Sequence, residues 1–248
     1  LYALCLHVIS GSPLPPDFNT AFMVFIPKKH HPNDSTRVAR APCDTRTLSL
    51  SNTDSKITSS ALLHLFTKSY TYLIHPTQYG LRGKNLLDAF FQMESSLLIA
   101  SATSPSPAAG LFDMHNAFPT LSRPYLWYLL EFLHCPPNII CALQNLYHNA
   151  KHIVFPLHHS DFTIIIANGL KQGCPLAAFL FSLAIVPLVS ALNRAATPFP
   201  SLSRSYLDDI AFIFHDLHKQ LPVVMRIITT FSTFSGLHLN LSLIHISE

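Results

Sequence analysis

The sequence predicts an α+β fold rather than a regularly wound α/β fold. Short runs rich in β-branched and aromatic residues are mixed with longer helical patterns, and they do not alternate one for one. No internal repeat is visible, and 248 residues suffice for one large domain or two small ones. We therefore expect a layer of strands covered by helices, with the strands joined in mixed order.

The first part of the chain is expected to contain one strand and two helices. The apolar run AFMVFI predicts a strand at 21–26, and a basic loop follows it. Helical patterns extend over about 55–70 and 84–99. The Ser-, Pro- and Ala-rich stretch at 101–110 predicts a loop or linker, which ends just before the next apolar run.

The rest of the chain has more strands, and two pairs of them are expected to form hairpins. The expected elements are a strand at 110–113, helices at about 123–133 and 137–150, a hairpin of 153–155 with 162–167, a helix at about 175–195, a hairpin of 204–207 with 210–214, a helix at 217–234 and a final strand at 237–241. These elements alone do not fix a function.

The apolar composition raises the alternative of a membrane protein. Half of the chain is hydrophobic (49%), only 12% is charged, and the mean hydropathy is +0.30. The longest apolar stretch, 175–192, is interrupted by Pro187 and contains Ser182 and Ser190. A spanning helix needs about 20 predominantly apolar residues. One such stretch without flanking anchors is weak evidence for a membrane protein.

The cysteines argue against a disulfide framework. Their number is odd, five, and no CxxC pair occurs, which favours a reducing compartment. A zinc site formed by Cys135, Cys141, His148 and His152 is an alternative, but the cysteine spacing is unlike that of zinc sites. With fifteen histidines in the chain, such a grouping can arise by chance.

The basic residues gather in one early stretch, although the formal net charge is only +3. A patch of this kind can bind a phosphate backbone, and the alternative is an ordinary solvated loop. The basic residues are Lys28, Lys29, Arg37, Arg40 and Arg46, and the acids among them are Asp34 and Asp44.

The segment YLDD at 206–209 is the clearest local candidate for a catalytic feature. Two adjacent acids separate β-rich runs, which predicts a hairpin with carboxylates in its turn. A lone Asp-Asp turn is unremarkable, because the Asp side chain can bond its own backbone. Two like charges at the end of a buried sheet repel each other, however, and a divalent cation would relieve that repulsion.

A second carboxylate has similar surroundings. Asp113 ends the short apolar run Gly110-Leu111-Phe112, so it is expected at the end of a strand. Two strand-end carboxylates from distant parts of a chain are what a two-metal phosphoryl-transfer site requires, because Mg²⁺ prefers carboxylates together with substrate phosphates. Residue chemistry alone allows this site without selecting it.

The segment GLKQGCPL at 169–176 joins a β-run to the long apolar pattern. Its glycines would let the backbone approach a ligand closely, and Pro175 suits a first helical turn. The spacing is not that of a P-loop. A plain strand-to-helix turn is the alternative.

These segments together resemble the reverse transcriptase domain of non-LTR (LINE-type) retrotransposons. Any one segment is weak evidence, but the full set occurs in the family's order across nearly the whole chain. The segments are FIPKK at 25–29, RTLSLSNTDSKI at 46–57, QYGLRGKN at 78–85, FDMHNAFPTLSRPYL at 112–126, GLKQGCPLAAFLFSLAI at 169–185, YLDD at 206–209 and SGLHLNLS at 235–242.

The resemblance implies the fold and reaction of a right-handed polymerase. Residues 1–100 would form part of the fingers and 101–248 part of the palm, whose antiparallel sheet is a split βαβ (ferredoxin-like) one. The implied activity is RNA-directed DNA synthesis with Mg²⁺ (or Mn²⁺) on an RNA template, with a DNA primer and deoxynucleoside triphosphates. The implied location is intracellular and nuclear, with no membrane partner.

The resemblance also assigns residues to the reaction. Asp113 and Asp208 would hold two Mg²⁺ ions, with Asp209 supporting them. Phe118 would lie under the sugar and exclude a 2′-hydroxyl, the group that distinguishes ribonucleotides. Arg46 would neutralise the triphosphate or the template backbone.

Further residues are implied in binding. Lys28 would act beside Arg46, while Gln172 and Gly173 would line the pocket near the incoming nucleotide and template. The residues implied in contacts with nucleic acid are Arg82, Lys29 and Tyr206.

Several departures from the family pattern favour an alternative, an inactive truncated remnant that at most binds nucleic acid. Pro119 stands where Asp is commoner, and Thr47 stands where Pro follows the Arg. Leu207 replaces a small residue beside the primer end, and Leu243 occupies the place of a lysine that would help protonate pyrophosphate. The start at Leu1 and the absence of a thumb or endonuclease segment predict a fragment of a longer protein.

Overall fold

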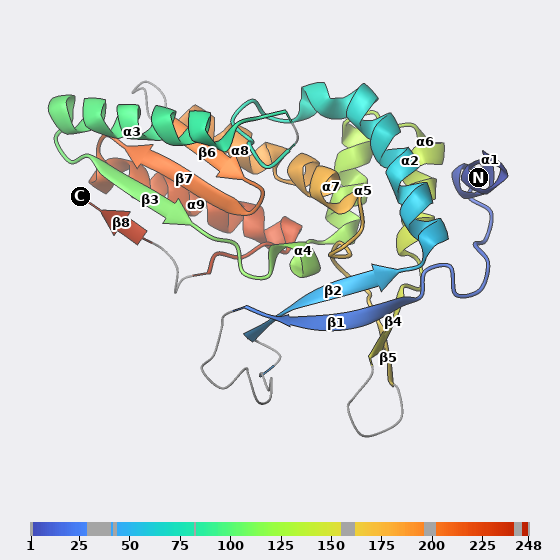
Figure 1. Ribbon diagram of the computed structural model, residues 1–248. Coiled ribbons are helices and arrows are strands. Elements are labelled where there is room, and N and C mark those ends of the chain that lie inside the picture. Colours follow the sequence, from blue (N-terminus) through green and yellow to red (C-terminus); the bar gives the residue numbers. More distant parts are fainter. Residues whose placement is uncertain are drawn as a thin grey trace. The chain divides into compact units, whose positions relative to one another are not determined.

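The computed structural model forms two compact units, each built from separate stretches of the chain (Figure 1). Unit 1 consists of Leu1–Leu63 and Leu130–Ala177, and unit 2 of His64–Leu129 and Ala178–Glu248. The structure describes residues 2–28, 41, 44–81, 83–154, 162–195, 202–240 and 245–247. The assignment of 1–100 to fingers and 101–248 to palm stays a prediction, since the compact units are divided differently.

Unit 1 contains a four-stranded sheet in the order β2-β1-β4-β5. β1 pairs antiparallel with β2 and parallel with β4, and β4 and β5 form the predicted hairpin. Its elements are α1 (Tyr2–Ile9), β1 (Ala21–Pro27), β2 (Thr45–Ser51), the first part of α2 (Thr53–Tyr70), α6 (Pro137–Tyr147), β4 (Lys151–Val154) and β5 (Phe162–Ile165).

The strand β2 was not predicted, and its burial explains why. The polar Ser49 is buried while Leu50 is 41% exposed, so the hydrophobic alternation is inverted. The backbone of Ser49 bonds the GLKQGCPL segment, since its N–H donates to the Gln172 carbonyl at 2.8 Å. A sequence pattern that relies on apolar residues facing inward therefore misses this strand.

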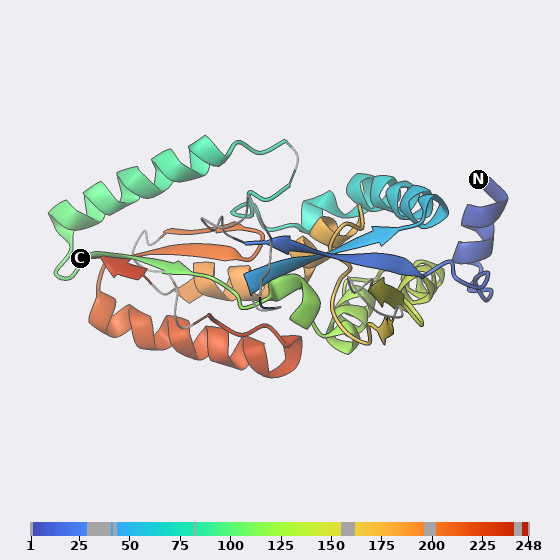
Figure 2. The ribbon, with the colours of Figure 1, turned by 60° about the horizontal axis from the view of Figure 1, so that its bottom comes forward.

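Unit 2 contains a four-stranded antiparallel sheet in the order β6-β7-β3-β8. Helix α3 lies on one face of this sheet and α9 on the other (Figure 2). Its elements are the last part of α2, a 3₁₀ turn (Thr71–Leu73), α3 (Leu86–Thr103), β3 (Ala108–Phe112), α4 (Ala117–Thr120), the first part of α5 (Arg123–Phe132), most of α7 (Ala177–Ala184), α8 (Val186–Ala195), β6 (Leu202–Tyr206), β7 (Asp209–Phe214), α9 (Leu217–Ser235) and β8 (His245–Ser247).

The sheet of unit 2 buries one face more completely than the other. Phe112, Phe212 and Phe214 alternate onto one face and are at most 2% exposed. Leu111, on the opposite face under α3, is 49% exposed. Burial of each Phe stabilises the fold by roughly 2–3 kcal/mol. The predicted α+β architecture is confirmed.

The predicted linker at 101–110 is mostly regular structure. Helix α3 continues to Thr103 because Ser101 and Thr103 donate their hydroxyls to carbonyls one turn earlier, so neither disturbs the helix. The helix ends before Pro105, since a residue that precedes proline disfavours helical geometry. Strand β3 then begins at Ala108. Composition alone predicted too long a loop.

The long helix predicted at 175–195 is two helices, α7 and α8, separated by Ile185. Pro187 stands in the first turn of α8, where its missing N–H costs little. The stretch Ala177–Ala195 is apolar and long enough to cross a membrane, and no other described helix is. More than half of this stretch is buried in the structure, as in the core helix of a soluble protein, so it is weak evidence for a membrane span.

The final strand predicted at 237–241 is absent from the described residues at 237–240. Gly236 ends α9 in the left-handed conformation (φ 75°), and a Cβ there would lie 2.6 Å from the Thr120 carbonyl oxygen. The chain then forms a single bridge, Leu239 with Met114. This places the segment after α9 beside the segment after β3.

Candidate active site

The hairpin of β6 and β7 presents the predicted carboxylates. Tyr206 pairs with Asp209, so Leu207 and Asp208 form a two-residue turn. Leu207 has φ 53°, a conformation that favours glycine or asparagine. Such strain costs on the order of 1–3 kcal/mol and persists only where neighbours hold it. The turn is therefore expected to be held by contacts from outside the hairpin.

Gln78 supplies those contacts. Its side chain is buried, and its Oε1 accepts hydrogen bonds from the backbone N–H groups of Leu207 (2.9 Å) and Gly80 (2.8 Å). The backbone around it runs along β6, with Tyr79 N–H donating to Ser205 O at 2.7 Å. Gln78 therefore ties the strained turn to the neighbouring segment.

Gly80 packs directly against the same turn. A Cβ at this position would lie 2.6 Å from Leu207 Cγ and 2.8 Å from its backbone nitrogen. No side chain fits there unless the β6–β7 hairpin moves. Gln78 and Gly80 together form the support of the turn.

The two carboxylates Asp113 and Asp209 lie close together. The last pair of the β3–β7 ladder is Phe112 with Ile210, so each Asp occupies the next position along its strand. Strand alternation puts both on the face opposite Phe112. Burial, and then the charge of Asp113, raise the pKa of the Asp209 carboxyl. In the part of the chain that the structure describes, neither makes an ion pair.

The segment after α9 holds Asp113 in place. The Asn240 side-chain amide donates to Asp113 Oδ2 at 3.1 Å, and the Asn240 backbone N–H donates to the Asp113 carbonyl at 2.8 Å. His115 N–H donates to His238 O at 2.8 Å on the same side. One carboxylate oxygen of Asp113 is thus oriented by an amide.

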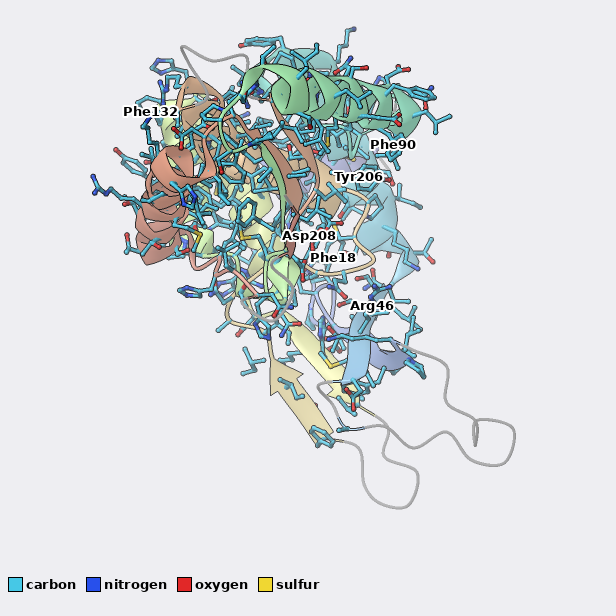
Figure 3. All side chains as sticks on the ribbon, turned by 90° about the vertical axis from the view of Figure 1, so that its left-hand side faces the viewer. Phe18, Arg46, Phe90, Phe132, Tyr206 and Asp208 are labelled. Atoms are coloured by element: carbon cyan, nitrogen blue, oxygen red, sulfur yellow. The ribbon has the colours of Figure 1, made fainter. Side chains whose placement is uncertain are left out.

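A cavity of about 370 Å³ lies between α3 and the sheet and ends at the carboxylates; we call it the α3 pocket. Its walls are mostly apolar, with two tyrosines and one arginine among them. Phe90 and Tyr206, which both line it, are labelled with Asp208 in Figure 3. The site thus combines paired carboxylates with an aromatic wall.

Phe118 follows the first carboxylate on α4. Its ring stacks on the buried Phe181, with centroids 4.7 Å apart and planes at 23°. Asn116 precedes α4 in the left-handed conformation (φ 46°), which turns the chain away from β3. The Phe118 ring is therefore fixed by an aromatic neighbour.

Two predicted nucleotide-binding residues lie at the ends of β1 and β2 in unit 1. Arg46 pairs with Ile26 across these strands and is exposed (labelled in Figure 3). Lys28 directly follows β1, and its backbone N–H donates to Asp44 O at 2.9 Å. Both cations therefore belong to the same end of one hairpin.

The GLKQGCPL segment packs against β2 in unit 1. Gly173 has φ 102°, and a Cβ there would lie 2.7 Å from Ser49 O, so close backbone packing already requires glycine. Lys171 is 4% exposed, donates to Leu146 O at 2.8 Å and lies over the Tyr147 ring. Lys171 is thus committed to packing within unit 1.

The predicted site residues fall into two groups. Asp113, Phe118, Tyr206, Asp208 and Asp209 belong to unit 2, and Lys28, Arg46, Gln172 and Gly173 belong to unit 1. The structure brings together Asp113, Tyr206 and Asp209, which line one pocket. Lys29 and Arg82 lie outside the described residues.

The zinc alternative has no support in the described part of the chain. No group of three or more His, Cys, Asp or Glu residues there is arranged to hold a metal ion. The same finding means that Asp208 does not form one compact cluster with Asp113 and Asp209. Asp208, in the turn, has an interaction of its own.

Sequence reasoning missed Gln78 and Asn240. Both lie inside segments that the resemblance had singled out, QYGLRGKN and SGLHLNLS. The signal that could have found them is an amide side chain in a segment otherwise expected to pack, such as Asn240 between Leu239 and Leu241. Such an amide has to find hydrogen-bond partners when it is buried.

Comparison with known families decides what this site belongs to. Residues 26–247 match the family described as "Reverse transcriptase (RNA-dependent DNA polymerase)". The chain belongs to this family. The reverse transcriptase domain therefore occupies nearly all of the sequence, including all seven segments named above except the first residue of the first.

A transposon protein is among the relatives of this reverse transcriptase domain. The "Transposon TX1 uncharacterized 149 kDa protein" of Xenopus laevis is 29% identical over 180 residues, which are 69% of this chain and 14% of that protein. The chain thus spans a small part of that relative. The predicted kinship with non-LTR retrotransposon enzymes is confirmed.

Solved structures similar to this reverse transcriptase domain include telomerases. Apo telomerase of Candida tropicalis, truncated from its C-terminal domain, has a TM-score of 0.64 at 14% identity, with 94% of this chain and 51% of that chain covered. Telomerase of Candida albicans with a fragment of telomeric RNA has a TM-score of 0.64 at 12% identity, with 95% and 44% covered. These likenesses confirm the predicted polymerase fold.

Proposed function

We propose that this domain is an RNA-directed DNA polymerase that joins a deoxynucleotide to a primer 3′-hydroxyl by two-metal nucleotidyl transfer. The observation that carries the proposal is the pair Asp113 and Asp209, which face each other beside the YLDD turn. Family membership supports the reaction class. The primer oxygen attacks the α-phosphate of the nucleotide, and pyrophosphate leaves.

The pair Asp113 and Asp209 suits hard divalent cations, although the described residues do not bring all three acids into one compact group. Asp113 and Asp209 offer carboxylate oxygens. Burial, and then the charge of Asp113, raise the pKa of Asp209, and no ion pair among the described residues offsets this. Asp208 would join them from the turn. Mg²⁺, when bound, would supply positive charge to the attacking and leaving oxygens. Asp113, Asp208 and Asp209 would be its ligands.

The supports of the carboxylates would keep the reactants aligned. Gln78 would fix the turn that carries Asp208, and Asn240 would fix one oxygen of Asp113. Displacement of reacting groups by about 1 Å can cost about 100-fold in rate. The hydrogen bonds of both amides therefore act on catalysis through position.

Phe118 would select deoxynucleotides. Its ring, stacked on Phe181, would not retreat to admit a 2′-hydroxyl beneath the incoming sugar. Replacing Phe118 by a smaller residue would therefore admit ribonucleotides. The wall of the α3 pocket at Tyr206 would contact the primer end.

Unit 1 would bind the nucleotide and the template. Arg46 and Lys28 would contact phosphates, and Gln172 with Gly173 would line the nucleotide site. Lys29 and Arg82 would add contacts with nucleic acid. An RNA template is supported by the telomerases of this fold, whose structures include complexes with telomeric RNA. Copying of RNA at chromosomal DNA would place the whole protein in the nucleus.

Primer extension tests the proposal. We expect the purified chain with Mg²⁺, a DNA primer on an RNA template and deoxynucleotides to extend the primer, and Asp208→Ala to abolish extension. Asp88→Asn, which removes an exposed carboxylate of α3 outside the α3 pocket, is the matched control and should extend normally. Equal extension by Asp208→Ala and the unchanged chain would contradict the proposal.

A second candidate, a remnant that binds nucleic acid without polymerising, is favoured by one observation. Leu207 places a bulky side chain in a left-handed position of the catalytic turn, packed against Gly80. If this blocks the primer end, the chain would bind RNA with an affinity that Asp208→Ala leaves unchanged, and would extend nothing. Extension regained in Leu207→Ala would identify that block.

A further inference from the structure

Three basic side chains meet beside β6 in unit 2, and we call them the basic cluster: His75, Lys84 and Arg204. The ammonium of Lys84 donates to Pro76 O at 2.5 Å and lies 5.3 Å from the centre of the Tyr79 ring. Pro76 directly follows His75, so Lys84 reaches back over a seven-residue loop to the backbone next to the imidazole. The contact places two basic groups of the loop together.

Arg204 joins the basic cluster from β6. Its guanidinium donates twice to the Gln92 side-chain oxygen, from Nε at 2.9 Å and from Nη2 at 2.6 Å. The Tyr79 hydroxyl donates to the same oxygen at 3.2 Å. Tyr79 thus touches both Lys84 and the Gln92–Arg204 pair, which makes it the centre of the basic cluster.

All hydrogen-bond partners of the basic cluster are neutral. Lys84 bonds a carbonyl, Arg204 an amide and a carbonyl, and His75 the Thr77 hydroxyl at 2.9 Å. The described part of the chain offers none of the three a carboxylate within ion-pair distance. Three basic groups therefore lie near one another with no carboxylate counter-ion among the described residues, an arrangement that suits an anionic ligand.

The charges of the basic cluster act on one another. Burial, then Lys84 and Arg204, lower the pKa of His75, and burial, then Arg204, lower the pKa of Lys84. A bound anion would reverse this, because an opposite charge nearby favours the protonated forms. The arrangement is therefore unfavourable alone and complementary to negative charge.

The surroundings select the kind of anion. Arg204 also lines the α3 pocket, together with Tyr79, Tyr206 and Phe90. Aromatic side chains interleaved with cations bind single-stranded nucleic acid, since bases stack on the rings while phosphates meet the charges. Tyr206 is 44% exposed and therefore accessible to a base.

We propose that His75, Lys84 and Arg204 bind one backbone phosphate of a nucleic-acid strand whose neighbouring base lies against Tyr79 and Tyr206. The proposal rests on the proposed function in one respect, that the strand is the RNA template or the DNA primer. Arg204 lies two residues before Tyr206 and four before Asp208, so the bound phosphate would belong to nucleotides close to the reacting end.

The salt dependence of binding tests the basic cluster without any catalysis. Fluorescence anisotropy would measure the affinity of the full chain for labelled single strands of RNA and of DNA with the same sequence, in EDTA, from 50 to 200 mM salt. Each phosphate contact adds about 0.7 to the slope of log K against log salt for single strands. We expect Lys84→Gln to lower this slope by about that amount, so that the salt-induced loss of affinity shrinks about threefold.

Two variants serve as controls. Lys84→Arg keeps the charge and should keep the slope. Arg226→Gln removes an equal charge from an exposed position of α9, the helix on the other face of the sheet, and should change the slope by less than half as much (Figure 2). Thermal unfolding of each variant would verify that the chain is folded.

The outcomes separate the site from the polymerase activity. A reduced slope with RNA alone would identify the strand as template, and with DNA alone as primer. Equal slopes for Lys84→Gln and Arg226→Gln, or no binding of either strand, would overturn the basic cluster as a phosphate site. Primer extension is measured separately. If the chain extends primers but Lys84→Gln leaves the slope unchanged, the proposed function stands and the phosphate site is refuted.

Discussion

Single amide side chains determine how the carboxylates of the proposed active site are positioned. Gln78 accepts two backbone hydrogen bonds next to the Leu207 turn, and Asn240 donates to Asp113. Neither amide titrates near neutral pH, and both are bonded to protein groups rather than exposed to a reactant. Their effect on the reaction has to pass through geometry, which makes it separable from substrate binding.

Replacing Gln78 by Leu should reduce the rate of incorporation far more than the affinity for primer and template. The change leaves the Leu207 and Gly80 N–H groups without their acceptor, at a cost of about 1–3 kcal/mol each if they stay buried. Gln78→Glu keeps an acceptor oxygen and should retain more activity than Gln78→Leu. Single-turnover rates and binding constants measured together would decide, and a pure loss of affinity would refute this role.

Replacing Asp113 by Asn should stabilise the metal-free chain at neutral pH while it removes activity. Burial, and then the charge of Asp113, raise the pKa of Asp209. The repulsion between the two ionised carboxylates therefore destabilises the fold, and this penalty disappears as pH falls and Asp209 binds a proton. Asn keeps an oxygen for the Asn240 bond. Urea unfolding should show the variant more stable at pH 7, with a difference that narrows toward pH 4. A constant difference would contradict this account.

At the scale of elements, glycines mark where two segments approach each other. Gly236→Ala should destabilise the chain by more than the roughly 1 kcal/mol of a left-handed alanine, because its Cβ would also lie 2.6 Å from Thr120 O. Gly83→Ala is the control, since Gly83 has φ 89° but open space around it. Urea midpoints should therefore fall further for Gly236→Ala, and equal shifts would disprove the close contact.

The pattern of apolar residues predicted most helices and strands, but not the segments whose positions depend on hydrogen bonds to distant residues. Strands β3 and β7 follow apolar runs, and Asp113 and the YLDD turn were predicted at their ends. Strand β2 was missed because it buries Ser49. The segment at 237–240, after α9, was mistaken for a strand because it bonds to the segment after β3 and joins no strand ladder. The local periodicity of apolar residues does not predict hydrogen bonds between segments that are distant in the sequence.

At the scale of the whole molecule, the chain builds each unit from separated stretches. In unit 1, β1 pairs with β4, which joins residues 21–22 to 152–153. A cut near residue 100 would therefore divide unit 1, although the sequence suggested a boundary there. We expect the fragment 1–100 to show no cooperative unfolding, whereas the full chain does. A cooperative transition in the circular dichroism of the fragment 1–100 alone would instead support a domain boundary near residue 100.

At the same scale, the chain belongs to the reverse transcriptase family. One measurement tests most directly the role proposed for its carboxylates. It is the rate at which the full chain adds a single deoxynucleotide to a DNA primer on an RNA template, compared for Asp113→Asn, Asp209→Asn and the control Asp88→Asn. The account predicts normal addition for Asp88→Asn and a loss of at least about 100-fold for the other two. Undiminished addition by Asp113→Asn would contradict it.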